Sequence, residues 1–134
     1  MKLFVATILF SFGLPSAVSP SQSVPPKHQP TTVSLDCAAK DCPLLKGFPQ
    51  TASLRSGFVR LKSGETVGWH TTGQNEETLV ILRGKGEAEI EGAASMPVTE
   101  KMIAYIPPAT RHNVKNTGDT PLEYIYVVAP AAEK

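Results

Sequence analysis

The sequence predicts an all-β domain of antiparallel strands, arranged as a sandwich or barrel, between residues 47 and 130. Short runs rich in Val, Ile, Leu, Tyr and Phe recur there, separated by glycine and other turn residues. The segment 87–91 reads Glu-Ala-Glu-Ile-Glu, an alternation typical of a strand with one face on the core and the other in water. Helices are expected to be nearly absent.

These runs predict seven strands. They are 57–62, 66–70, 77–83, 86–91, 102–106, 111–115 and 122–128. Turns are expected at 63–64, 83–86 and 116–119, where glycine and asparagine adopt positive φ angles at little cost. The run Leu79–Leu82 is apolar at both parities, which predicts a central strand covered on both faces.

Residues 1–19 have the pattern of a secretory signal peptide. One cation, Lys2, precedes an apolar stretch from Leu3 to Leu14, and small residues follow it. The stretch is shorter than the roughly 20 residues that a membrane-spanning helix needs. We therefore expect cleavage and a secreted or periplasmic protein without a membrane span. An uncleaved N-terminal anchor is the alternative.

Residues 20–46 are expected to form a Pro/Ser-rich linker, since prolines lie among Ser, Gln and Thr with no periodic apolar pattern. Cys37 and Cys42 lie near its end. In an oxidising compartment two cysteines this close are expected to form a small disulfide loop, with free thiols as the alternative. A redox or metal pair fits less well, because the spacing is not Cys-x-x-Cys and no histidine lies nearby.

Composition excludes several classes of function. The chain has 134 residues, 13 Lys and Arg against 12 Asp and Glu, and a formal net charge of +1. Its length suits one compact domain, and without a basic run it does not resemble a nucleic-acid binder. The sequence contains no phosphate-binding loop, dinucleotide fingerprint or nucleophile triad. Hydride transfer with a dinucleotide cofactor and P-loop hydrolysis are therefore not expected.

Two clusters hold the residues best suited to chemistry. The first follows the pattern G-x5-H-x-H-x(3,4)-E-x6-G through Gly64, His70, Glu77 and Gly84. Thr72 stands where this pattern has its second histidine.

The second cluster follows the pattern P-x-G-x-x-H-x-x-x-N through Pro107, His112 and Asn116, with Ala109 at the glycine position. Together the two clusters resemble the motifs of the cupin superfamily, specifically a small single-domain cupin of the cupin-2 type, over residues 57–128. The resemblance implies a double-stranded β-helix, or jelly-roll barrel, for residues 47–130. Pro107 and Asn116 are expected to be architectural, starting a strand and shaping a turn.

The resemblance implies that His70, Glu77 and His112 are metal ligands, and strand alternation allows their side chains to converge inside a barrel. Two histidines and one carboxylate suit ferrous iron, with manganese, nickel or zinc as other divalent candidates. Thr72 weakens this set, because a hydroxyl is a poor ligand that could at best bond a metal-bound water. Gln74 could compensate through its amide oxygen. Histidines satisfied by hydrogen bonds in the core are the alternative.

Neighbouring residues carry weaker expectations. Glu76 is the fallback for Glu77, because adjacent residues on a strand face opposite sides. Trp69 is expected to pack, and Arg111 to point away from the cavity as a surface charge. The strand tyrosines are expected to be structural, with a hydroxyl lining the pocket as the alternative. They are Tyr105, Tyr124 and Tyr126.

Three functions remain open at this stage. A metal-dependent enzyme, such as an oxygenase, isomerase or decarboxylase, would orient a small molecule at the metal, with Glu76, Tyr105 or a metal-bound water as the acid or base. A binding module would hold a sugar, organic acid or metal ion without turnover. A homodimeric structural domain with a vestigial pocket is the third, since small barrels often cover sheet edges by pairing. Catalytic residues are not assigned.

Overall fold

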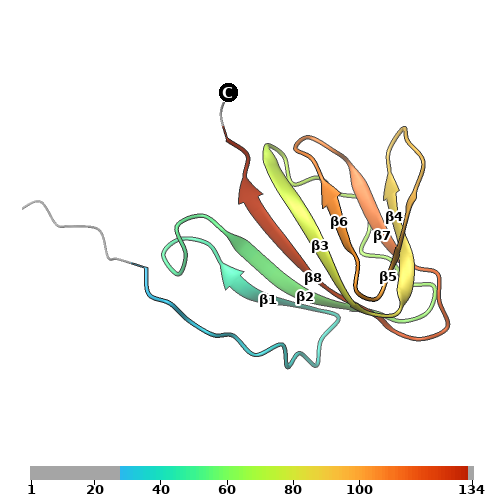
Figure 1. Ribbon diagram of the computed structural model, residues 1–134, viewed down its shortest axis with the longest axis horizontal. Helices are drawn as coiled ribbons and strands as arrows, with labels where there is room; N and C mark the ends of the chain where they lie inside the picture. The colour runs from blue at the N-terminus through green and yellow to red at the C-terminus, as the bar shows by residue number, and fades with distance from the viewer. Residues whose placement is uncertain (1–27, 133–134) are drawn as a thin grey trace, which may run out of the picture.

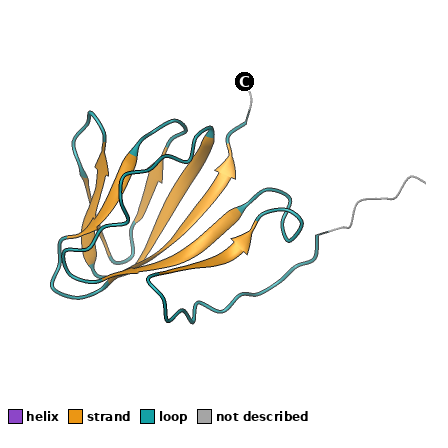
Figure 2. Ribbon diagram, turned by 180° about the vertical axis from the view of Figure 1, so that it is seen from behind, coloured by secondary structure: helices purple, strands orange, loops and turns teal. Residues whose placement is uncertain are grey.

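The computed structural model describes residues 28–132, and these form two antiparallel β-sheets that face one another (Figure 1). The all-β, antiparallel prediction is therefore confirmed. Figure 2 shows only strands and loops, and among the described residues no helix has the length and apolar character needed to cross a membrane. The predicted signal peptide, residues 1–19, lies outside the described residues.

Eight strands build the sheets. They are β1 (Asp41–Lys46), β2 (Arg55–Leu61), β3 (Asn75–Arg83), β4 (Lys85–Ile90), β5 (Met96–Thr99), β6 (Ile103–Ile106), β7 (His112–Asn116) and β8 (Leu122–Pro130). The larger sheet has the order β1-β2-β8-β3-β6 and the smaller one β5-β4-β7. Strand β8, last along the chain, therefore lies in the middle of the larger sheet and pairs with β2 and β3.

The core lies between the sheets because each strand turns alternate side chains inward. On β3, Leu79 and Ile81 are buried, and on β7 Val114 is buried. The same alternation buries Glu77 and His112, two polar side chains. The fold therefore directs the motif residues of β3 and β7 into the space between the two sheets.

The structure corrects two strand predictions. The stretch 66–70 is no continuous strand: only Thr66 and His70 form isolated bridges to β7, because Gly68 between them has a φ of 92°. The outer face of the run Leu79–Leu82 is only partly covered, since Val80 is half-buried and Leu82 is 36% exposed. Its strand nevertheless lies between two others, as expected for an interior strand.

Two strands were not anticipated. β1 lies within the segment 20–46 that was expected to be a linker, and it pairs with β2 along the edge of the larger sheet. β5 is the short edge strand of the smaller sheet. The sulfur atoms of Cys37 and Cys42 lie at disulfide distance, as predicted. Arg60 of β2 donates a 3.0 Å hydrogen bond to the carbonyl of Cys37, which ties this loop to the sheet.

Asn116, the last residue of the second motif, is fully buried and fastens the turn that follows β7. Its amide group donates to the carbonyls of Leu61 and Thr120, and its side-chain oxygen accepts from the N–H of Gly118. The side chain therefore links the end of β2 to the β7–β8 turn. The architectural role predicted for Asn116 is confirmed.

Gly64 and Gly84 provide a matched pair of stability tests, since both have positive φ angles, of 77° and 83°. A Cβ at Gly84 would lie 2.5 Å from the carbonyl oxygen of Pro121, whereas a Cβ at Gly64 would meet nothing within 4 Å. Gly64→Ala should cost about 1 kcal/mol from backbone strain alone. Gly84→Ala should cost about 1–3 kcal/mol more, because the Pro121 backbone must move. Urea unfolding measures both, and equal losses would contradict the close approach at Gly84.

Candidate metal centre

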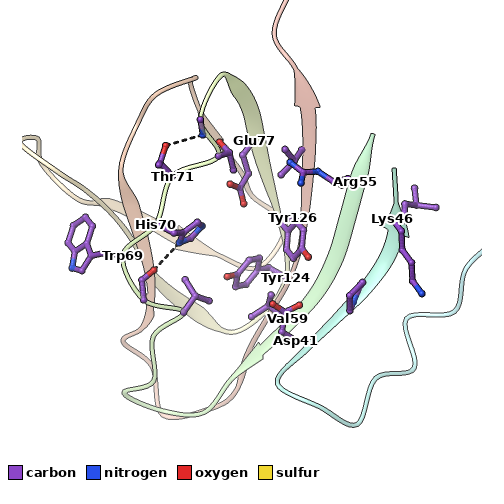
Figure 3. A pocket seen from close by; sticks show the side chains of 17 residues that line it. Asp41, Lys46, Arg55, Val59, Trp69, His70, Thr71, Glu77, Tyr124 and Tyr126 are labelled. Carbon is purple, nitrogen blue, oxygen red and sulfur yellow. Dashed lines mark hydrogen bonds between the residues drawn. The ribbon is translucent and has the colours of Figure 1, made fainter. Parts of the chain in front are cut away.

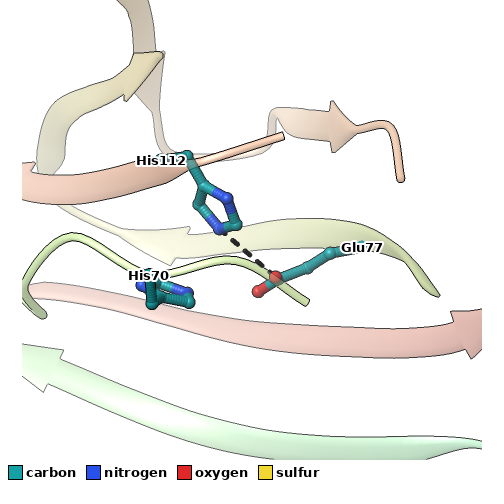
Figure 4. A group of neighbouring side chains, drawn as sticks. All are labelled: His70, Glu77 and His112. Atoms are coloured by element: carbon teal, nitrogen blue, oxygen red, sulfur yellow. Dashed lines mark ion pairs between the residues drawn. The ribbon is translucent and has the colours of Figure 1, made fainter. Parts of the chain in front are cut away.

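His70, Glu77 and His112 meet between the two sheets (Figure 4). Each offers one donor atom, and the three donor atoms lie within 4.8 Å of one another. Glu77 comes from β3 of the larger sheet and His112 from β7 of the smaller one, while His70 lies on the loop before β3. The three candidate residues thus converge in space, although 42 positions separate the first from the last in the sequence.

Backbone pairing places the two imidazoles side by side. The N–H of His70 donates to the carbonyl of His112 at 2.9 Å, and the N–H of His112 donates back at 2.8 Å. Residues that exchange both bonds lie directly opposite each other and turn their side chains to the same face. The ring centroids are consequently 4.3 Å apart. The isolated bridge between His70 and His112 therefore positions the side chain of His70 in the site.

The same backbone fixes the orientation of both rings. Nδ1 of His70 lies 2.9 Å from the carbonyl oxygen of Gly68, and Nδ1 of His112 lies 3.0 Å from that of Thr110. A carbonyl can only accept, so each Nδ1 carries the proton and donates. Each neutral ring then has its Nε2 lone pair free. This is the tautomer in which histidine binds a metal through Nε2 while a backbone carbonyl holds the other nitrogen.

Two buried polar atoms at this centre are unsatisfied. Nε2 of His112 lies 3.3 Å from Oε2 of Glu77, and the side chains are 0% and 5% exposed. Neither atom has a hydrogen-bond partner among the described residues. Leaving such groups unpaired costs about 1–3 kcal/mol each. The arrangement differs from a satisfied core histidine and fits two donors prepared for a cation.

Burial and charge act in opposite directions on His112. Burial alone lowers the pKa of this imidazole, but the adjacent Glu77 carboxylate and the Thr110 carbonyl outweigh it, so the pKa is raised. A metal would bind Nε2 of the unprotonated imidazole, so metal binding at His112 competes with a proton.

The structure separates Glu77 from its fallback. Glu77 is buried in the centre, whereas the carboxylate of Glu76 accepts a 3.0 Å hydrogen bond from the hydroxyl of Tyr105, which is 54% exposed on the outer side of the sheet. The inward orientation of Glu77 is confirmed. Glu76 and Tyr105 lie on the outer side of the sheet, so the acid-base role considered for them is not supported.

Thr72 stands where the first motif has its second histidine, and Gln74 was suggested to compensate for that loss. Neither residue is placed as a metal ligand would be. The hydroxyl of Thr72 donates to the carbonyl of Asn75 at 2.9 Å and so closes the turn into β3, although the residue still lines the cavity. Gln74 is exposed and does not line the cavity. The structure therefore gives no support to the compensation suggested for Gln74.

Hydrogen bonds from neighbouring residues hold the loop that carries His70. Asn113, buried on β7, accepts from the N–H of Gly68 at 2.9 Å and donates to Glu89. The carbonyl of Gly68 in turn accepts from His70.

Arg111 pairs with Glu91 at 2.6 Å and lies over the ring of Trp69. Arg111 points away from the cavity, as expected.

A cavity of about 1000 Å³ adjoins the centre (Figure 3). His70, Glu77 and Thr72 line it from one side, and Tyr124 and Tyr126 of β8 line it from the floor of the larger sheet. The sequence alternative in which tyrosine hydroxyls reach the pocket thus holds for two of the three tyrosines. The lining residues that the sequence did not single out lie mostly on β1, on β2 and on the loop before β3.

Replacing Glu77 with Gln should lower the pKa of His112 in the metal-free protein. Burial of the imidazole would then act without the opposing carboxylate charge. Titration of the imidazole by NMR measures the change. Glu76→Gln is the matched control and should leave the pKa of His112 unchanged, because Glu76 faces the other side of the sheet. An unchanged pKa in Glu77→Gln would contradict the geometry.

Comparison with known proteins agrees with this architecture. The Cupin domain family matches residues 57–128, and no curated protein matches the sequence. A solved protein from Bacillus halodurans is 22% identical with a TM-score of 0.67, over 79% of this chain and 85% of that one. A predicted oxalate decarboxylase from Thermotoga maritima is 18% identical with a TM-score of 0.57, over 75% of this chain and all of that one (100%).

The cupin domain of Cnp3 from Schizosaccharomyces pombe is 22% identical with a TM-score of 0.61. The match covers 68% of this chain and 64% of the Cnp3 chain, so this chain spans slightly less than two thirds of that relative. At these identities the solved structures establish the fold alone. With the two motifs, the paired sheets and the match over residues 57–128, the chain belongs to the cupin family.

Proposed function

We propose that this cupin binds one divalent transition-metal ion through Nε2 of His70, Nε2 of His112 and the carboxylate of Glu77, and that it holds a small molecule in the adjoining cavity. The observation that carries this proposal is the unsatisfied pair, Nε2 of His112 and Oε2 of Glu77. A cation between these atoms and His70 would satisfy both.

The donor set fits such an ion chemically. Two neutral imidazoles and one carboxylate suit iron, manganese, nickel or zinc in the divalent state. Three protein donors leave coordination positions open, and Thr72, whose hydroxyl is committed to Asn75, does not fill one. When bound, the metal would supply a Lewis acid beside the cavity.

The open positions favour binding of a small molecule, and they leave a metal-dependent enzyme as the second candidate. The cavity of about 1000 Å³ is large enough for a ligand of small-molecule size. Tyr124 and Tyr126 place two hydroxyl donors at its floor. A purely structural domain with a vestigial pocket fits less well, because it gives the unsatisfied pair no role.

Export of the protein is part of the proposal. It is supported by the signal-like pattern of residues 1–19 and by the Cys37–Cys42 pair at disulfide distance. Disulfides of this kind persist in secreted and periplasmic proteins and are rare in the cytosol. Formation of a homodimer, predicted because small barrels often cover their sheet edges by pairing, also stays a prediction.

Calorimetric titration of the metal-free full chain with Zn²⁺ should give one equivalent bound. His70→Ala should weaken binding by at least about 100-fold, since even the loss of a residue that only supports a ligand costs 10–100-fold. His70 lies on an exposed loop position, so this variant should fold. Glu76→Gln should bind as the unchanged protein does. Equal affinity in His70→Ala, or no zinc binding at millimolar concentration, would overturn the proposal.

A further inference from the structure

We infer that the cavity takes a small organic anion, whose carboxylate is held by Arg55, Tyr124 and Tyr126 on the inner face of the larger sheet while its other end faces the metal. These three residues are called the anion subsite below. The inference rests on the proposed metal site and specifies the class of ligand that it serves.

Strand register places a cation in the same row as the metal-binding carboxylate. Lys46 of β1 pairs with Arg55 of β2, Arg55 pairs with Val128 of β8, and Val128 pairs with Glu77 of β3. Paired residues point to the same face of a sheet. Arg55 and Glu77 are thus two strands apart, or about 10 Å between backbones. A carboxylate of modest length could reach from one end of this row to the other.

The tyrosines lie in the two neighbouring rows. Tyr126 pairs with Gly57 and Leu79, and Tyr124 pairs with Val59 and Ile81. The ring of Tyr126 lies against Gly57, since a Cβ at that position would collide with it. The glycine lets the Tyr126 ring lie flat over β2. In Figure 3 the two rings lie between His70 and Arg55.

The anion subsite consists of donors without partners. Tyr124 is only 2% exposed and lines the cavity, yet its hydroxyl makes no hydrogen bond with any residue that the structure describes, and the same holds for Tyr126. Arg55 is exposed, lines the cavity and forms no ion pair within residues 28–132. Burial and then the charge of Glu77 raise the pKa of Tyr124, which therefore stays protonated and can donate.

The charges of the cavity favour a negative ligand. Four charged side chains line it, and the acids Asp41 and Glu77 offset the bases Lys46 and Arg55. A divalent ion on Glu77 would leave the whole cavity positive. A phenol hydroxyl and a guanidinium are strong donors to a carboxylate, and hydrogen bonds to a charged acceptor are about twice as strong as neutral ones. A neutral or cationic ligand would gain neither advantage.

Three probes with one ring and different charge test the inference: benzoate, benzyl alcohol and benzylamine, each titrated calorimetrically into the zinc-loaded full chain. Benzoate should bind at least tenfold more tightly than the other two. Arg55→Met and Tyr124→Phe should each weaken benzoate about tenfold while zinc affinity stays within twofold. Equal or tighter binding of benzyl alcohol or benzylamine would overturn the inference.

Arg83→Met and Tyr105→Phe are the matched controls, since both side chains are exposed and neither lines this cavity. Both should bind benzoate normally. If benzoate binds equally well to Arg55→Met and Tyr124→Phe but is lost without zinc, the metal alone recognises the anion, and the anion subsite is wrong while the proposed metal function stands. Failure of zinc to bind would instead refute the proposed metal function.

Discussion

The backbone pairing of His70 with His112 is the constraint on which this site depends. Two reciprocal hydrogen bonds hold an otherwise irregular loop against β7, and they set the imidazoles 4.3 Å apart. Gly68 interrupts the pairing two residues earlier, which frees its carbonyl to accept from Nδ1 of His70. The loop therefore sets both the position and the tautomer of His70, the candidate ligand. Glu77 needs only the regular alternation of β3 to complete the set.

Much of this could be predicted from the sequence because it depends on local pattern. Motif spacing favoured Glu77 over Glu76 as the inward residue, and alternation placed His112 on the same face as Val114 and Asn116, all buried. Glycine and asparagine marked turns correctly, as Gly84 and Asn116 show. The inward faces and the turns need only the period of a strand and the backbone demands of a turn, whereas the choice of His70, Glu77 and His112 came from the resemblance to the cupin motifs.

The remainder depends on long-range contacts that local pattern does not contain. β1 has polar residues and a proline, so its sequence alone resembles a linker, and only pairing with β2 makes it a strand. The stretch 66–70 has strand-like composition, but the positive φ of Gly68 interrupts it and leaves only two isolated bridges. Arg55, Tyr124 and Tyr126 come together because β2 and β8 lie side by side, an order that is not sequential. The residues of the cavity floor can therefore be identified only when the order of the strands in the sheet is known.

The most direct measurement of the central claim is anomalous diffraction from crystals of the full chain soaked in Zn²⁺, recorded on both sides of the zinc absorption edge. The account predicts one strong peak at about 2.0–2.2 Å from Nε2 of His70, Nε2 of His112 and a carboxylate oxygen of Glu77. A peak bound elsewhere, or none between these three side chains in fully soaked crystals, would contradict it.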